Sequence, residues 1–174
     1  QFFYVNPLET NPGTSGTIFG YKHVLPTRPG WYACACCPPN LVRLVTSLGT
    51  YAWSESDTTL YSHLFLGQTA DFEKAVVKVD SSYPWEGKVT YQVKAKMKDA
   101  FELAIHIPSH IRIDTLCVTV NGEKTDAASC IKDGYLYLKQ NWGENDVIEL
   151  TFDLPVRKIY ANTNVREDEG CVAL

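Results

Sequence analysis

Hydrophobic and polar residues alternate with a period of two along most of the chain from Thr59 onward. This spacing is typical of strands that bury one face and expose the other. The alternating runs place apolar residues at positions 89, 91 and 93, at 101, 103, 105 and 107, at 118 and 120, at 136 and 138, and at 148, 150, 152 and 154. Asn121-Gly122 and Asp133-Gly134 lie between such runs and predict tight hairpin turns.

One segment has the period of a helix instead. Pro38 and Pro39 suit a first helical turn, where a missing N–H costs nothing. Apolar residues then recur with a spacing near that of a helix, at Leu41, Leu44, Val45, Leu48 and Ala52. We expect a helix over about residues 39–51, with its apolar face docked on the sheet core. Residues 1–33 are rich in Gly, Pro and Thr and predict loops.

These patterns predict a mainly β fold. Strands at this spacing, joined by Gly, Asn and Asp turns, indicate an antiparallel β-sandwich of the jelly-roll kind. A loop-plus-helix segment precedes it, and we expect the domain boundary between residues 55 and 56, with residues 56–174 forming the sandwich. The chain opens on strand-like residues and closes on an apolar run, so we expect a piece of a longer protein.

Charge and hydropathy exclude two classes of partner. The chain has 16 Lys and Arg against 20 Asp and Glu, which gives a net charge of −4. A mildly acidic chain lacks the basic surface that nucleic acid or an anionic membrane requires. No apolar run approaches the ~20 residues of a membrane-spanning helix. We therefore expect neither nucleic acid nor a membrane as partner.

The cysteines concentrate the candidate chemistry. Three of the six, Cys34, Cys36 and Cys37, fall within four positions directly before the predicted helix. A thiolate is both a metal ligand and a nucleophile, and a helix start favours an anion. The paired C-x₂-C spacing of structural zinc sites is absent, so a zinc site would need ligands from elsewhere. The isolated cysteines are expected to be buried, inert thiols: Cys117, Cys130 and Cys171. This usage indicates a reducing, cytoplasmic location.

A specific motif extends these observations. It reads Cys34-Ala-Cys36-Cys37-Pro-Pro-Asn40 and is followed by the apolar helix and the sandwich. Further matching stretches occur in the same order, at residues 3–8, at 107–109 before the Asn121-Gly122 turn, at 154–157 and at 164–166. With these motifs the chain resembles the β-L-arabinofuranosidase family of glycoside hydrolases, glycoside hydrolase family 127.

The resemblance implies an (α/α)6-barrel catalytic domain of which residues 1–55 are the incomplete C-terminal end. It also implies a retaining mechanism in which the zinc-bound thiolate of Cys36 is the nucleophile and Cys37 is a zinc ligand. Cys34 is then a candidate to support these ligands. The family's remaining ligands and its acid/base Glu lie earlier in the barrel, so the chain alone should be inactive and should require the barrel domain.

The substrate implied is a carbohydrate ending in β-linked L-arabinofuranose. His23 and Trp31 lie in the loop before the cysteines and are candidates to line the sugar pocket, whereas His63 is expected on the sheet surface. The alternative is a non-catalytic β-sandwich used for carbohydrate binding or domain packing, with buried, inert cysteines. An apolar helix face without its barrel neighbours also predicts self-association of the chain.

Overall fold

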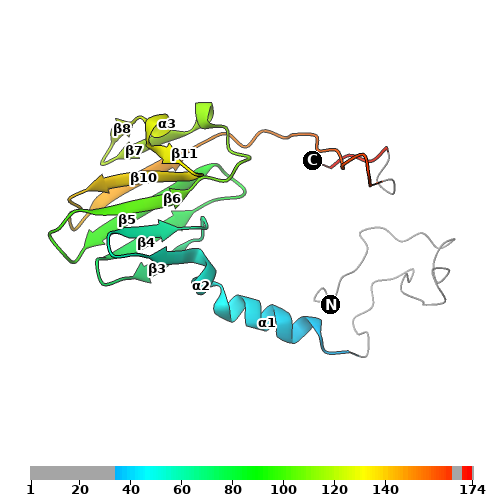
Figure 1. Ribbon diagram of the computed structural model, residues 1–174, viewed down its shortest axis with the longest axis horizontal. Coiled ribbons are helices and arrows are strands. Elements are labelled where there is room, and N and C mark those ends of the chain that lie inside the picture. Colours follow the sequence, from blue (N-terminus) through cyan, green and yellow to red (C-terminus); the bar gives the residue numbers. More distant parts are fainter. Residues whose placement is uncertain (1–33, 166–169, 174) are drawn as a thin grey trace. The chain divides into compact units, whose positions relative to one another are not determined.

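The computed structural model describes residues 34–165 and 170–173. Among these residues the fold is a sandwich of a five-stranded and a six-stranded sheet, which confirms the predicted mainly β class (Figure 1). The five-stranded sheet has the order β1-β2-β6-β10-β9 and is called sheet A below. The six-stranded sheet has the order β3-β4-β5-β11-β7-β8 and is called sheet B.

The strands of sheet A are β1 (Trp53–Glu55), β2 (Thr59–Ser62), β6 (Phe101–His106), β9 (Ile131–Lys132) and β10 (Tyr135–Gln140). The strands of sheet B are β3 (Gln68–Asp71), β4 (Ala75–Ser81), β5 (Lys88–Ala95), β7 (Cys117–Val120), β8 (Glu123–Thr125) and β11 (Asp146–Thr151). Helical segments are α1 (Cys37–Ser47), α2 (Gly49–Ala52), η1 (Ile113–Thr115) and α3 (Ala127–Cys130). Within the described ranges, no helix has the length and hydropathy needed to span a membrane.

The core lies between the two sheets and follows the alternation of the sequence. Every second residue of β5 is buried, and the same holds for β10 and β11, whereas in the central strand β6 three consecutive residues, Leu103, Ala104 and Ile105, are buried. The largest fully buried side chains come from both sheets: Tyr91, Phe101, Leu60, Leu103, Ile105, Leu136, Ile148 and Leu150. The Tyr91 hydroxyl reaches across the core to Ser62 Oγ at 3.0 Å, so one buried hydrogen bond joins the sheets.

Both predicted hairpin turns are present. Asn121 and Gly122 have φ values of 53° and 82°, and Asp133 and Gly134 have 50° and 81°. Two successive residues with positive φ define the turn that matches the twist of paired strands. The first turn joins β7 to β8 and the second joins β9 to β10. Local residue chemistry therefore sets the register of these two hairpins.

One strand pair departs from the expected antiparallel arrangement. β2 runs parallel to β6, with Leu60 opposite Leu103 and Ser62 opposite Ile105. Parallel neighbours cannot be joined by a short turn, and here the connection passes through β3, β4 and β5 of sheet B. All other pairs between the named strands of the described chain are antiparallel.

The predicted helix is present but starts two residues earlier and is interrupted. It begins at Cys37, and a break at Leu48 separates α1 from α2. Near the break, Thr46 Oγ1 donates to the carbonyl of Val42 and Ser47 Oγ to that of Arg43, at 3.0 Å and 2.8 Å. Such side-chain bonds compete with the helical ladder and bend helices. No residue of α1 is buried in this chain.

The chain divides into two compact units after Thr50. α1 belongs to the first unit, and every strand named above for the described residues belongs to the second. The predicted boundary after residue 55, the barrel origin of the first unit and the docking of α1 on the sandwich stay predictions.

Candidate functional site

The cysteine motif lies at the start of α1, where the sequence predicts it. Cys36 is the residue flanking the helix and Cys37 is its first residue, with prolines in the first turn. The two sulfur atoms are 3.5 Å apart. Cys36 has helical backbone angles, φ −72° and ψ −44°. Because Cys36 and Cys37 are adjacent and both helical in conformation, their two side chains lie at the same end of the helix.

Two polar side chains of the following turn hold the backbone of this end. Asn40 Nδ2 donates to the carbonyl oxygen of Cys36 at 2.6 Å. Arg43 in turn donates from its guanidinium to Asn40 Oδ1. This chain of contacts fixes the Asn40 amide with its nitrogen toward Cys36. Asn40 is thus a positioning residue for Cys36.

The pair lies at the helix end where the peptide dipoles point their positive side. The first turn of α1 contains no acidic residue, and Pro38 and Pro39 contribute no N–H there, so the helix dipole and not a set of free N–H groups faces the sulfurs. Cys36 is exposed and Cys37 half-buried, so both sulfurs can meet a ligand. The arrangement can therefore hold a cation between two thiolates or present one thiolate to an electrophile.

The spacing of the pair fits zinc. Two sulfurs at Zn–S distances of ~2.3 Å and a tetrahedral angle lie about 3.8 Å apart. The observed 3.5 Å is close to this value. Within the described residues, however, no three His, Cys, Asp or Glu side chains converge on a metal position. The pair could supply two ligands, and the others would have to come from outside this part of the chain.

Of the other candidate site residues, the structure describes only Cys34. Cys34 is exposed. His23 and Trp31 lie outside the described residues. Cys36 is exposed and so is not the buried thiol of the non-catalytic alternative. Of the isolated cysteines that were expected to be buried, Cys117 and Cys130 are half-buried, and the expectation is wrong for Cys171, which is exposed outside the sandwich strands.

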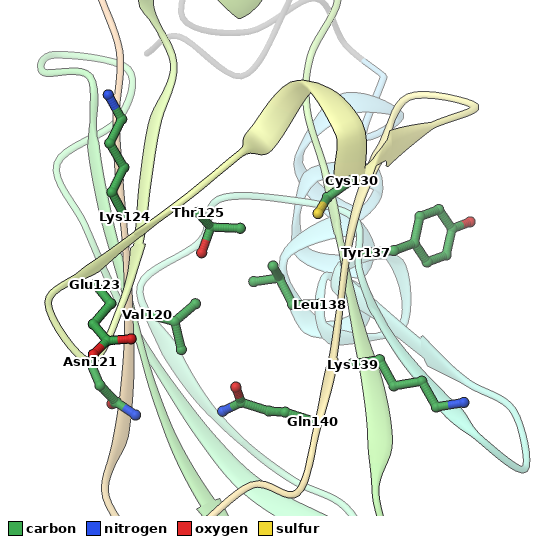
Figure 2. A pocket seen from close by; sticks show the side chains of 10 residues that line it. All are labelled: Val120, Asn121, Glu123, Lys124, Thr125, Cys130, Tyr137, Leu138, Lys139 and Gln140. Atoms are coloured by element: carbon green, nitrogen blue, oxygen red, sulfur yellow. The ribbon is translucent and has the colours of Figure 1, made fainter.

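A separate cleft lies at one edge of the sandwich, between the β7–β8 hairpin and β10. It has a volume of about 520 Å³. Figure 2 shows Val120, Leu138, Thr125 and Cys130 pointing into it, whereas Tyr137 points away. The cleft thus combines aliphatic side chains with a hydroxyl, a thiol and the Gln140 amide, and its lining is somewhat more polar than apolar. Sequence patterning did not predict it, because the cleft depends on how the edges of the two sheets meet.

The thiol in this cleft differs from Cys36 and Cys37, which are called the motif pair below. Cys130 has the Ser129 hydroxyl as a contact, with sulfur and oxygen 3.8 Å apart. It is half-buried and lies in the short helix α3. A single thiol of this kind provides neither paired metal ligands nor a nucleophile with a base. The motif pair therefore remains the candidate site.

One histidine of the sandwich is held by its neighbours. His63 Nε2 is 2.8 Å from Ser54 Oγ, and Nδ1 is 2.7 Å from the Tyr135 hydroxyl. Partial burial and the nearby imidazole of His106 lower the pKa of His63 below its ordinary value of 6.5. Because both ring nitrogens are engaged, His63 is placed for structure and not for proton transfer.

Comparison with known proteins now decides the family. The family model described as the middle domain of GH127 β-L-arabinofuranosidases matches residues 59–154, more than half of the chain and nearly all of the sandwich strands. The chain belongs to glycoside hydrolase family 127.

Relatives of this GH127 chain include enzymes with known names and structures. The non-reducing end β-L-arabinofuranosidase of Bifidobacterium longum is 37% identical over 180 residues, covering 100% of this chain and 27% of the relative. The crystal structure of the GH127 β-L-arabinofuranosidase Ara127N from Geobacillus stearothermophilus T6 matches with a TM-score of 0.84 and 38% identity. That match covers 99% of this chain and 27% of the other.

A third structure, the GH127 β-arabinofuranosidase BT3674, matches with a TM-score of 0.73 and 27% identity over 84% of this chain and 26% of its own. The GH127 chain described here thus spans about a quarter of the length of the relatives it matches.

Proposed function

We propose that this chain is part of a retaining glycoside hydrolase that removes terminal β-linked L-arabinofuranose, with Cys36 as nucleophile and Cys36 and Cys37 as zinc ligands. The names of the relatives support the reaction and substrate class. The observation that carries the residue assignment is the pair of sulfur atoms 3.5 Å apart at the start of α1.

The residues of the chain have distinct parts in this reaction. The Cys36 sulfur attacks the anomeric carbon, so a sulfur–carbon bond forms as the bond to the leaving oxygen breaks. The leaving oxygen takes its proton from an acid outside this chain, and water later displaces the sugar from sulfur, which gives retention. Asn40 holds the Cys36 backbone in place during both steps. Zinc bound at the pair would keep the sulfurs ionised.

The chain alone should not turn over substrate. The resemblance places the acid/base Glu and two further zinc ligands in the barrel upstream of these residues. General acid–base assistance alone contributes ~10²–10⁴-fold to rate. We therefore expect no measurable cleavage of an aryl β-L-arabinofuranoside by the purified 174-residue chain, and robust turnover by it would contradict the proposal.

The decisive test uses the full-length enzyme. Cys36→Ser keeps the size of the side chain but leaves a hydroxyl, a poor nucleophile at neutral pH. We expect a normally folded enzyme that no longer cleaves. Cys37→Ser should lose zinc together with activity. The control is Cys117→Ser, on a strand of the sandwich, which should leave zinc content and cleavage near the wild-type values.

Three measurements read the outcome: zinc by atomic absorption, folding by circular dichroism, and cleavage of the aryl glycoside. Cleavage by the Cys36→Ser enzyme at near the wild-type rate would show that a carboxylate elsewhere is the nucleophile. Sugar binding by the full-length protein without any cleavage would instead favour the non-catalytic carbohydrate-binding alternative. The cytoplasmic location stays a prediction.

Self-association of the chain is a further part of the proposal. The apolar residues Leu41, Val42, Leu44 and Val45 of α1 are 39–63% exposed. Exposed apolar surface of this kind favours association. Sedimentation velocity should show a weight-average mass that rises with concentration for the 174-residue chain, and a concentration-independent monomer would contradict this.

A further inference from the structure

The two outer faces of the sandwich differ in chemistry. On sheet B, the residues that point away from the core are largely charged or polar: Lys78, Asp80, Lys88, Gln92, Lys94 and Glu149. Lys78 and Asp80 form an ion pair at 2.9 Å, and Lys88 lies 4.0 Å from Glu149. Such a mixed, charged face is what solvent exposure favours.

The outer face of sheet A carries rings instead. Tyr61 and His63 come from β2 and the residue after it, His106 from the end of β6, and Tyr135 and Tyr137 from β10. All five side chains are half-buried. We call these five residues the tyrosine face. Neighbouring ring centroids within it lie 5.2–6.4 Å apart.

The rings close over the centre of the sheet. Ala104 of β6 lies between Tyr61 on one side and Tyr137 on the other in the strand register. Adjacent strands are ~4.8 Å apart, so β2 and β10 are separated by about 9.6 Å. The Tyr61 and Tyr135 centroids are nevertheless only 6.0 Å apart, so the rings lean across β6. Ala104 is therefore 0% exposed although its neighbours in sequence, Leu103 and Ile105, fill the core.

Hydrogen bonds lock this arrangement. The imidazole of His63 bridges Ser54 Oγ and the Tyr135 hydroxyl, which lie on opposite sides of β6 in sheet A. The Tyr135 ring meets those of Tyr61 and His63 edge-on, with interplanar angles of 88° and 85°. A surface ordered before binding loses little conformational entropy when a partner covers it.

We propose that the tyrosine face is the docking surface for another domain of the same GH127 polypeptide. Tyrosine is enriched in the buried centres of protein interfaces, and the tyrosine face has three tyrosines and no lysine or acidic residue among its five members. Glu102 and Lys139, which are paired in the strand register, and Lys132, which is paired with Tyr135, supply charged groups at its border, like the polar rim of an interface. The sandwich corresponds to the middle domain of the family, and about three-quarters of the relatives' length lies outside the chain. A neighbouring domain of the same polypeptide is thus available to cover the face.

The ring geometry favours a protein partner over a glycan. Sugars stack on exposed, flat ring faces, whereas here all five rings are half-buried and the Tyr135 ring meets those of Tyr61 and His63 edge-on. Tyr137, which points away from the edge cleft in Figure 2, belongs to this same outer face. The proposal depends on membership of the family and not on the role of Cys36.

Hydroxyl-radical footprinting read by mass spectrometry tests it. The 174-residue chain and the full-length enzyme are labelled side by side. Tyr61 and Tyr137 should be oxidised several-fold more slowly in the full-length enzyme, while Met97, in the β5–β6 connection, should react at similar rates in both. The full-length Cys36→Ser enzyme should give the same footprint, so failure of the nucleophile assignment leaves this test unaffected.

A matched pair of substitutions supplies the second measurement. Tyr137→Lys should lower the thermal midpoint of the full-length enzyme more than that of the 174-residue chain. Thr90→Lys, a half-buried outward position on sheet B, should shift both midpoints alike. Equal labelling of Tyr61 and Tyr137 in the two proteins would overturn the proposal. Protection that is lost on dilution would also overturn it, because it would indicate that a second copy covers the face. Protection that arises only with an added arabinofuranosyl oligosaccharide would overturn it as well, because it would indicate a glycan site.

Discussion

Gly87 lies directly before β5, and its backbone packs against the backbone of Phe152, directly after β11. A Cβ atom at position 87 would lie 1.8 Å from the Phe152 carbonyl oxygen and 2.8 Å from its carbonyl carbon. Since real Cβ contacts stay beyond 3.0 Å, the two segments would have to separate by at least 1.2 Å, the difference 3.0 − 1.8. Neither contact atom belongs to a flexible side chain that could move aside.

The cost of Gly87→Ala follows from what this separation disturbs. The Phe152 N–H donates to the Gly87 carbonyl at 2.9 Å, and losing one such bond costs about 0.5–1.5 kcal/mol. The Phe152 ring is buried and lies 5.9 Å from that of Phe65, and forcing extra volume into a packed core costs about 1–3 kcal/mol. We expect a loss of about 2–4 kcal/mol in the free energy of unfolding.

Urea unfolding of the 174-residue chain measures this loss, because the buried Trp53 and Trp142 report on the sandwich by fluorescence. The matched control is Gly67→Ala, where the nearest atom to an added Cβ is the Val79 carbonyl oxygen at 3.8 Å. The control should stay within about 0.5 kcal/mol of wild type. If Gly87→Ala is equally neutral, the close approach of the two segments is wrong.

Three further substitutions probe the other polar contacts. Burial and His106 lower the pKa of His63 in the folded chain, so the unfolded chain binds more protons below about pH 6.5. The free energy of unfolding should therefore fall as the pH drops from 7 to 5. This fall should be smaller in the His63→Gln variant. Tyr91→Phe leaves the buried Ser62 hydroxyl without its partner and should lower the free energy of unfolding by about 1–3 kcal/mol. In a double-mutant cycle read by denaturation, Tyr91→Phe/Ser62→Ala should lose less stability than the two single variants added together. Asn40→Ala in the full-length enzyme should lower kcat more than it changes KM, and equal changes in both would contradict its positioning role.

The sequence was a good guide wherever one residue's neighbours decide its structure. The alternation through Val89, Tyr91 and Val93 predicted β5 and its buried face, and the Asn121-Gly122 pair predicted a hairpin. In each case the period or the turn chemistry is local and unambiguous.

Pairing between distant segments was not predictable in the same way. The alternation of β2 shows which of its faces is buried, but not that β6 runs parallel beside it. The tyrosine face depends on that pairing, because it brings Tyr61 next to Ala104 and hence within reach of Tyr135. Gly87 likewise carries no local signal, since its restriction comes from Phe152, far away in the sequence.

The sequence predicted where the candidate site lies in the chain, but it predicted only some of the contacts that its residues make. Three cysteines in four positions before two prolines predicted the helix start, and Cys36 and Cys37 do lie there. The Asn40 bond to Cys36 was not predicted, although the spacing of four residues along a helix permits it. The zinc assignment rests on the family resemblance and stays a prediction.

Under the proposed function, stability and chemistry are carried by different parts of this chain. The sandwich buries its own core, with side chains from both sheets fully enclosed, so it can fold on contacts that it contains. α1 has 11 residues and buries none of them here, and isolated helices shorter than ~12–15 residues are marginal in water. Under the proposed function, the positions of the two sulfurs therefore depend on whatever covers α1 in the full-length enzyme. Substitutions in the sandwich core should then act on stability, and substitutions along α1 should act on turnover.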